Sequence, residues 1–106
     1  MVIITSQNFQ KEIIESTKPV VIDAFATWCG PCKHMEPFFA ELAEQYGDKY
    51  TFAKLNVDEA RDIAISYNVT SVPTFLFIKN GKVIDTTMGY MPKEELEAKI
   101  LEVFGS

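Results

Sequence analysis

The sequence predicts a three-layer α/β/α domain, in which one mixed sheet carries helices on both faces. Three observations lead to this class. Strand-like apolar runs alternate with helical patterns over the first two thirds of the chain, which is typical of right-handed parallel βα units. The run at residues 20–26 is apolar almost throughout, as in a strand buried on both faces. Further on, Asn80-Gly81 separates two strand-like runs and predicts an antiparallel hairpin.

The first half of the chain is expected to hold two strand–helix units. Residues 2–4 form a short apolar strand, and Ser6 is expected to cap a helix that reaches residue 16. The buried strand at residues 20–26 comes next. After it, apolar positions recur at helical spacing until Gly47, where a glycine favours the end of a helix.

The second half is expected to hold a third strand–helix unit, the hairpin and a last helix. In chain order these elements are a strand at 50–57, a short helix capped by Asp58 that ends near Asn68, hairpin strands at 74–78 and 83–88, and a helix that Pro92 opens. Aspartate is a favoured helix cap, and proline is favoured at a first helical position. Three parallel-type βα units are therefore followed by an antiparallel hairpin.

The composition fits one globular domain over residues 1–106, since 47% of the residues are apolar and 24% are charged. The net charge is −5 and the ten Lys and Arg residues are scattered, whereas a nucleic-acid binder needs a basic stripe. No apolar run approaches the roughly 20 residues of a membrane span. The first residues lack the basic and long apolar regions of a signal peptide, so we expect a cytoplasmic protein.

The only two cysteines, Cys29 and Cys32, directly follow the buried strand and lie three residues apart. A bridge between them closes almost no loop, so it would stabilise the fold poorly, and the pair indicates redox chemistry. Cys29 is placed at the start of a helix, where free N–H groups favour a thiolate. We therefore expect Cys29 to attack a substrate disulfide, and Cys32, one turn further and more buried, to resolve the mixed disulfide.

The neighbours of the two cysteines suit contact with a substrate chain. Trp28 offers a large apolar surface beside the nucleophile. Gly30 permits close approach to the sulfurs, and Pro31 is compatible with a first helical turn.

A pair of cysteines is also half of a zinc site. Structural zinc needs four ligands, but the chain has one histidine and no second cysteine pair. That histidine, His34, lies two positions beyond Cys32, about 200° around the helix, and is expected to point away. We therefore predict no metal unless two chains share a site.

The motif Trp28-Cys29-Gly30-Pro31-Cys32-Lys33 resembles the active site of the thioredoxin family. Other stretches that resemble the family, in the same order, are residues 53–58, 72–74 and 79–81, and Gly89. The resemblance spans essentially the whole chain. It implies a thioredoxin-like fold and a general protein-disulfide reductase that needs no cofactor beyond its Cys29–Cys32 disulfide.

The resemblance also implies roles for residues away from the cysteines. Asp23 corresponds to a buried carboxylate that assists deprotonation of the resolving cysteine, and Lys54 to a lysine near it. Burial in an apolar strand would raise the pKa of Asp23, which suits a proton acceptor, although a strand aspartate can also simply pair with a cation. Pro73 corresponds to a cis-proline that, with Val72, helps to hold an extended substrate segment. Gly89 corresponds to a loop glycine beside the same groove.

The sequence departs from the family pattern in places. Phe25 stands where many relatives carry tryptophan, and Tyr90 stands where they often have a smaller residue, so Tyr90 is expected to enlarge the substrate contact surface. His34 and Glu36 match no family role, and a solvated charged face accounts for both.

Three functions remain to be separated on the sequence. A monomeric general reductant, acting on disulfide-containing proteins and recharged by a reductase such as thioredoxin reductase, is favoured because Gly30-Pro31 resembles the reducing members. An oxidase or isomerase usually carries a histidine between the cysteines. A redox-capable subunit of another assembly is the third reading, and the double replacement of both cysteines by serine would distinguish it.

Overall fold

The central element of the fold is strand β2 (Val20–Phe25), which lies between strands that run in opposite directions. In the computed structural model, which describes residues 1–105, a five-stranded sheet has the order β1-β3-β2-β4-β5. Its other strands are β1 (Val2–Ile3), β3 (Thr51–Asn56), β4 (Thr74–Lys79) and β5 (Lys82–Met88). β2 pairs in parallel with β3 and antiparallel with β4, and β4 and β5 form the hairpin. The predicted mixed sheet is thus confirmed.

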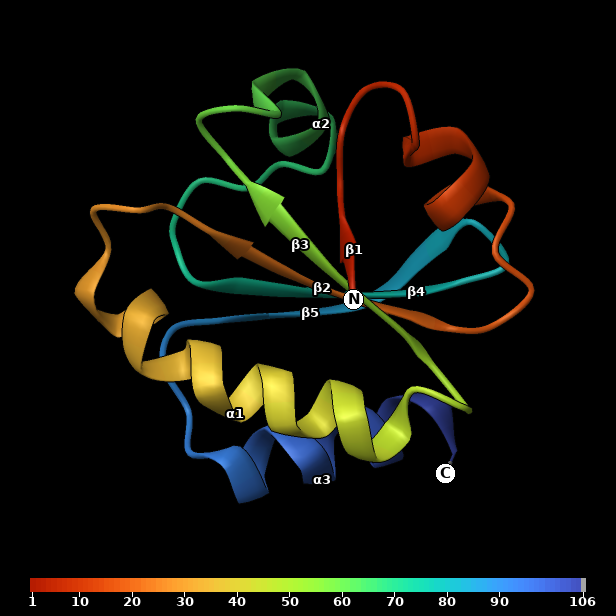
Figure 1. The fold of residues 1–106 in the computed structure, drawn as a ribbon, viewed down its shortest axis with the longest axis vertical. Helices are drawn as coiled ribbons and strands as arrows, with labels where there is room; N and C mark the ends of the chain where they lie inside the picture. Colours follow the sequence, from red (N-terminus) through yellow and green to blue (C-terminus); the bar gives the residue numbers. More distant parts are fainter. Residues whose placement is uncertain (106) are drawn as a thin grey trace.

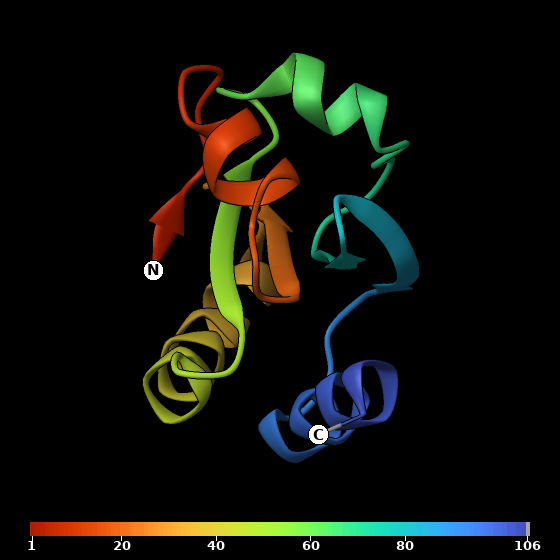
Figure 2. The ribbon, with the colours of Figure 1, turned by 90° about the vertical axis from the view of Figure 1, so that its right-hand side faces the viewer.

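Helices cover both faces of this sheet (Figure 1). Helices α1 (Gly30–Tyr46) and α3 (Lys93–Phe104) lie on one face, and α2 (Arg61–Ser66) and a short π-helical turn, η1 (Gln10–Ile14), lie on the other. The view turned by 90° shows the same separation, with the sheet between the two sets of helices (Figure 2).

Side chains alternate along the strands and so divide the core into two halves. Towards α1 and α3 the sheet sends mainly aromatic side chains, which pack on the buried apolar stripe of both helices: Val21, Phe52, Phe75 and Phe77 against Met35, Phe39, Leu42, Leu96 and Ile100. Towards η1 and α2 it sends aliphatic side chains: Val20, Ile22, Ala24, Ala53, Leu55, Leu76 and Ile78. Five consecutive residues of β2, from Val20 to Ala24, are buried, as expected for a strand covered on both faces.

The N-terminal helix differs from the prediction. Ser6 does not cap it: the N-cap residue of η1 is Phe9, which makes no side-chain cap bond. In the turn before η1, the Thr5 hydroxyl accepts the N–H of Asn8, and the Asn8 carboxamide accepts the N–H of Thr5. Only one wide turn follows, in which Glu15 donates to the carbonyl of Gln10. Both Thr5 and Ser6 have a hydroxyl that can accept a backbone N–H, and the partner three residues on decides between them.

The third helical segment is also shorter than predicted, and Asp58 does not cap it. The carboxamide of Asn56 accepts the N–H groups of Asp58 and Glu59, which turns the chain before α2 begins at Arg61. The last helix begins one residue later than predicted, since Pro92 takes the N-cap position of α3. Within residues 1–105, none of the helices combines the length and the apolar character needed to cross a membrane.

Candidate active site

The two cysteines lie at the junction between β2 and α1, at the carboxyl end of the strand. They are joined in a disulfide with their Cα atoms 5.3 Å apart. Cys29 is the N-cap residue of α1, and its Sγ accepts the backbone N–H of Cys32 at 3.2 Å. A sulfur at this position meets the free N–H groups and the positive dipole end of a 17-residue helix, which favours its thiolate form.

The exposure of the cysteines does not separate their roles as predicted. Cys29 is 5% exposed and Cys32 is 4% exposed, because the bond between the sulfurs holds both against the end of the strand. Their surroundings do differ. Cys32 lines a hollow of about 400 Å³ that also borders Lys33, Glu36 and Lys54, whereas Cys29 is outside that lining.

Asp23 is a fully buried carboxyl group on β2, on the face that α1 covers. It lies between Val21 and Phe25 in the alternation of the strand, and Val21 belongs to the core under α1. Among residues 1–105, neither of its carboxylate oxygens has a hydrogen-bond partner. The pKa of Asp23 is raised from 3.8 to about 6, chiefly because the group is buried. The nearby positive charge of Lys54 lowers this pKa, and the negative charge of Glu36 raises it. A carboxyl group with such a pKa can exchange a proton near neutral pH.

Lys54 is the neighbour of Asp23 across the β2–β3 pair, but the two form no ion pair. Its ammonium group instead lies 3.5 Å from a carboxylate oxygen of Glu36 and 4.3 Å from the ring centre of Phe25. The alternative interpretation of Asp23, as a strand aspartate that simply pairs with a cation, is therefore not supported by the part of the chain that the structure describes.

Trp28 forms one side of the site and is 70% exposed, as the sequence predicted. Its indole N–H donates to the Asp58 carboxylate at 3.0 Å, so the ring is held although it faces solvent. Trp28 and Val72 both line a hollow of about 130 Å³, and Val72 also packs against the cysteines.

The segment before β4 is joined by a hydrogen bond to the residue that follows β5. The Val72–Pro73 peptide bond is cis, as the resemblance implies, and the Pro73 carbonyl accepts the N–H of Gly89 at 2.8 Å. Gly89 has a φ of 96°, a backbone conformation that favours glycine. Tyr90, which follows it, is 52% exposed and lines a hollow with two residues of α1, Pro31 and His34.

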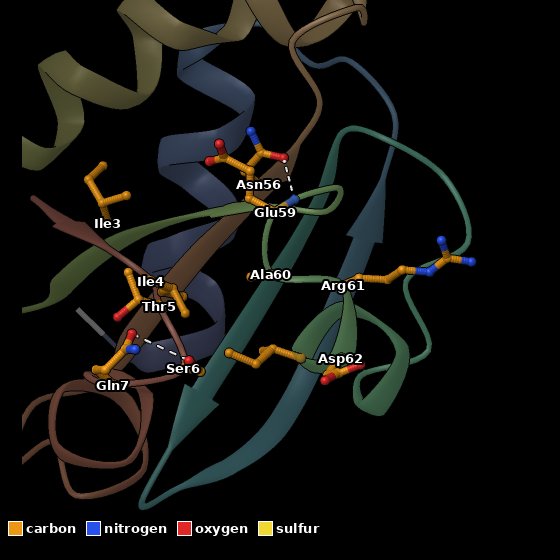
Figure 3. A pocket seen from close by; sticks show the side chains of 11 residues that line it. Ile3, Ile4, Thr5, Ser6, Gln7, Asn56, Glu59, Ala60, Arg61 and Asp62 are labelled. Atoms are coloured by element: carbon orange, nitrogen blue, oxygen red, sulfur yellow. Dashed lines mark hydrogen bonds between the residues drawn. The ribbon is translucent and has the colours of Figure 1, made fainter.

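The structure thus places Val72 against the two cysteines and joins Pro73 to Gly89. It turns Lys54 towards Glu36. Sequence reasoning missed the contributions of Asp58 and Glu36, which are distant in sequence from their partners and have no motif of their own. Another hollow, of about 360 Å³, lies between the segment after β1 and the start of α2 (Figure 3). Its lining includes neither cysteine, and Figure 3 shows the Arg61 side chain directed away from the Thr5–Gln7 wall.

The sequence model of the Thioredoxin family matches residues 1–102 of the chain. A thioredoxin of Chlorobaculum thiosulfatiphilum is 48% identical over 101 residues, which cover 95% of this chain and 94% of that protein. A thioredoxin of Alicyclobacillus acidocaldarius subsp. acidocaldarius is 44% identical over 100 residues, or 94% of each chain. Thioredoxin 1 of Synechococcus elongatus is 40% identical over 93 residues, which cover 88% of this chain and 87% of that protein.

The fold and the paired cysteines define a thiol–disulfide oxidoreductase, and the chain belongs to the thioredoxin family. Its function is dithiol–disulfide reduction of proteins, and its partners are disulfide-containing substrates and a reductase. These findings confirm the fold class, the family and the type of reaction that the sequence predicted.

Proposed function

We propose that the chain is a general protein-disulfide reductase in which Cys29 attacks the substrate and Cys32 resolves the mixed disulfide. The observation that carries this assignment is the hydrogen bond from the Cys32 N–H to the Cys29 sulfur at the start of α1. That donor and the helix dipole stabilise a negative charge on Cys29, and a thiolate is the form that attacks a disulfide.

In the first step, the Cys29 thiolate attacks one sulfur of the substrate disulfide. A bond forms between Cys29 and that sulfur, the substrate S–S bond breaks, and the released thiolate takes a proton from water. Val72 packs against the cysteines and shares a hollow with Trp28, and Tyr90 shares another hollow with Pro31, which lies between the two cysteines in sequence. An extended substrate segment can pair there with the backbone N–H and carbonyl of Val72.

In the second step, the Cys32 thiol gives its proton to the Asp23 carboxylate, directly or across one water. The Cys32 thiolate attacks Cys29, the Cys29–Cys32 bond forms, and the second substrate sulfur leaves as a thiolate that is then protonated. Two electrons have passed to the substrate, and the oxidised pair in the structure is the product. The raised pKa of Asp23 supports this role, because a base is most effective when its pKa lies near the working pH.

The pair itself carries the two electrons, so we propose that no other cofactor takes part. We further infer that thioredoxin reductase returns the electrons, that the chain acts as a monomer with its own core, and that it acts in the cytoplasm. Disulfide reductants work where thiols are kept reduced, which supports this location.

The assignment is tested by insulin reduction, with NADPH and thioredoxin reductase as the electron source and reduced glutathione as the comparison source. We expect turnover with the reductase, and turnover with glutathione alone would contradict the proposed donor. The variant Cys32→Ser is expected to accumulate mixed disulfides through Cys29, which mass spectrometry detects, while Cys29→Ser accumulates none. Mixed disulfides through Cys32 in Cys29→Ser would reverse the two roles.

A further inference from the structure

Asp23 and Glu36 are the two carboxylates that Lys54 could pair with, and the structure shows which one it contacts. Its ammonium group lies 3.5 Å from Glu36 on α1, over the ring of Phe25. Asp23 is the neighbour of Lys54 in the β2–β3 register, but neither of its carboxylate oxygens has a hydrogen-bond partner within the described part of the chain. Lys54 is only 11% exposed, so the ion pair with Glu36 is partly shielded from water.

We propose that Glu36 is a positioning residue of the redox site, which holds the Lys54 ammonium away from Asp23 and so keeps Asp23 able to take up the Cys32 proton near neutral pH. The inference rests on the proposed role of Asp23. The Glu36–Lys54 ion pair and Cys32 line the same hollow, so the ion pair lies beside the path from the Cys32 thiol to solvent.

The charges that face Asp23 come from two elements. β3 contributes Lys54, and α1 contributes Glu36, with Cys32 and Lys33 lining the same hollow. On the β4 side the neighbour in register is Phe75, which carries no charge. After burial, which has the largest effect on the pKa of Asp23, Lys54 lowers that pKa and Glu36 raises it.

Removal of the Glu36 charge therefore has two effects on Asp23, and both lower its pKa. The direct repulsion between the two carboxylates disappears, and Lys54 loses the partner that holds it away from Asp23. Both changes favour the ionised form of Asp23 and lower its pKa. Asp23 would then titrate at lower pH and would be a weaker base for the Cys32 proton.

The test compares Glu36→Gln with Glu41→Gln. Glu41 is a matched control, because it lies on the same helix, is 58% exposed against 64% for Glu36, and pairs with Lys93 at 3.0 Å. The Asp23 carboxyl carbon is titrated by NMR in the oxidised proteins. We expect the midpoint to move to lower pH in Glu36→Gln and to stay at the wild-type value in Glu41→Gln. A midpoint that is unchanged, raised, or lowered equally in both variants would overturn the proposal.

A second measurement separates this proposal from the reductase function. The rate of mixed-disulfide resolution is followed against pH in the reduced proteins. We expect its acid limb to move to lower pH in Glu36→Gln, with a lower plateau, and Glu36→Asp to restore part of the wild-type profile. If the Asp23 titration moves but the acid limb does not, the positioning role is wrong although reduction still occurs. A wild-type protein that reduces no disulfide at any pH would instead contradict the reductase function, while the NMR titration would still report on Glu36.

Discussion

Replacement of Asp23 by asparagine is expected to stabilise the folded protein at neutral pH. The carboxyl group is fully buried, and neither oxygen has a hydrogen-bond partner among the residues that the structure describes. Asparagine has nearly the same shape but cannot ionise. The variant therefore removes the unfavourable free energy of burying a charge at this position. It also removes the proposed proton acceptor.

The size of the effect follows from the pKa. Asp23 has an ordinary value of 3.8, and its value in the folded protein is about 6. As the pH rises, the unfolded chain loses this proton first, so the free energy of unfolding falls between these two values and is constant above them. At about 1.4 kcal/mol per pH unit, the full difference is about 3 kcal/mol.

Urea unfolding of the oxidised proteins at several pH values measures this difference. We expect Asp23→Asn to exceed wild type by about 3 kcal/mol at pH 8 and by only roughly 0.5 kcal/mol at pH 4. Asp85→Asn is the control of opposite sign, because the hydrogen bond from Lys99 holds the pKa of Asp85 below its ordinary value. Loss of the Asp85 carboxylate should lower the free energy of unfolding slightly, and only at a pH where Asp85 is ionised. A gain from Asp23→Asn that is the same at pH 4 and pH 8 would refute the electrostatic reasoning.

Two further substitutions test the sides of the site. Asp58→Ala removes the acceptor of the Trp28 indole N–H. We expect the KM for protein disulfides to rise about 2- to 10-fold and the fluorescence anisotropy of Trp28 to fall, because the ring becomes more mobile. An unchanged KM would show that the hydrogen bond does not hold the ring for binding. Gly89→Ala places a side chain at a φ of 96° with no atom to clash with, so backbone strain alone should cost about 1–2 kcal/mol in urea unfolding. Gly30→Ala, which also meets no atom within 4 Å, is its control, and equal losses in both would contradict this explanation.

The layout of the strands could be predicted from the sequence because the apolar patterns that encode it are local. The continuous apolar run before Cys29 gave the central strand, and Asn80-Gly81 gave the hairpin with both residues at positive φ. The position of the cysteine pair then followed from the end of that strand. Helix starts were less well predicted, because Thr5, Ser6, Asn56 and Asp58 are all good caps, and only the folded turn selects among them.

Contacts between polar groups that are distant in sequence could not be predicted. The Trp28–Asp58 hydrogen bond joins residues 30 positions apart, and the Glu36–Lys54 ion pair joins a helix to a strand. No spacing rule relates such residues. The first contact depends on β2 and β3 being parallel neighbours that end at the same edge of the sheet, and the second on the crossing of α1 over the sheet. For the same reason the resemblance placed Lys54 near Asp23 but did not show that Glu36 competes for it.

The reversed direction of β4 has a consequence for the order in which the site is completed during synthesis. Because β4 is antiparallel to β2, the beginning of β4 meets the end of β2, and Thr74 lies opposite Ala24. This pairing brings a late segment of the chain to an early one. The cysteines leave the ribosome some 40 residues before the Val72–Pro73 segment that borders them, and almost 60 residues before Gly89. A nascent chain that ends before Val72 carries both thiols but not the edge on which we propose that a substrate segment pairs. On that proposal, selective recognition of substrates has to wait for the last third of the chain.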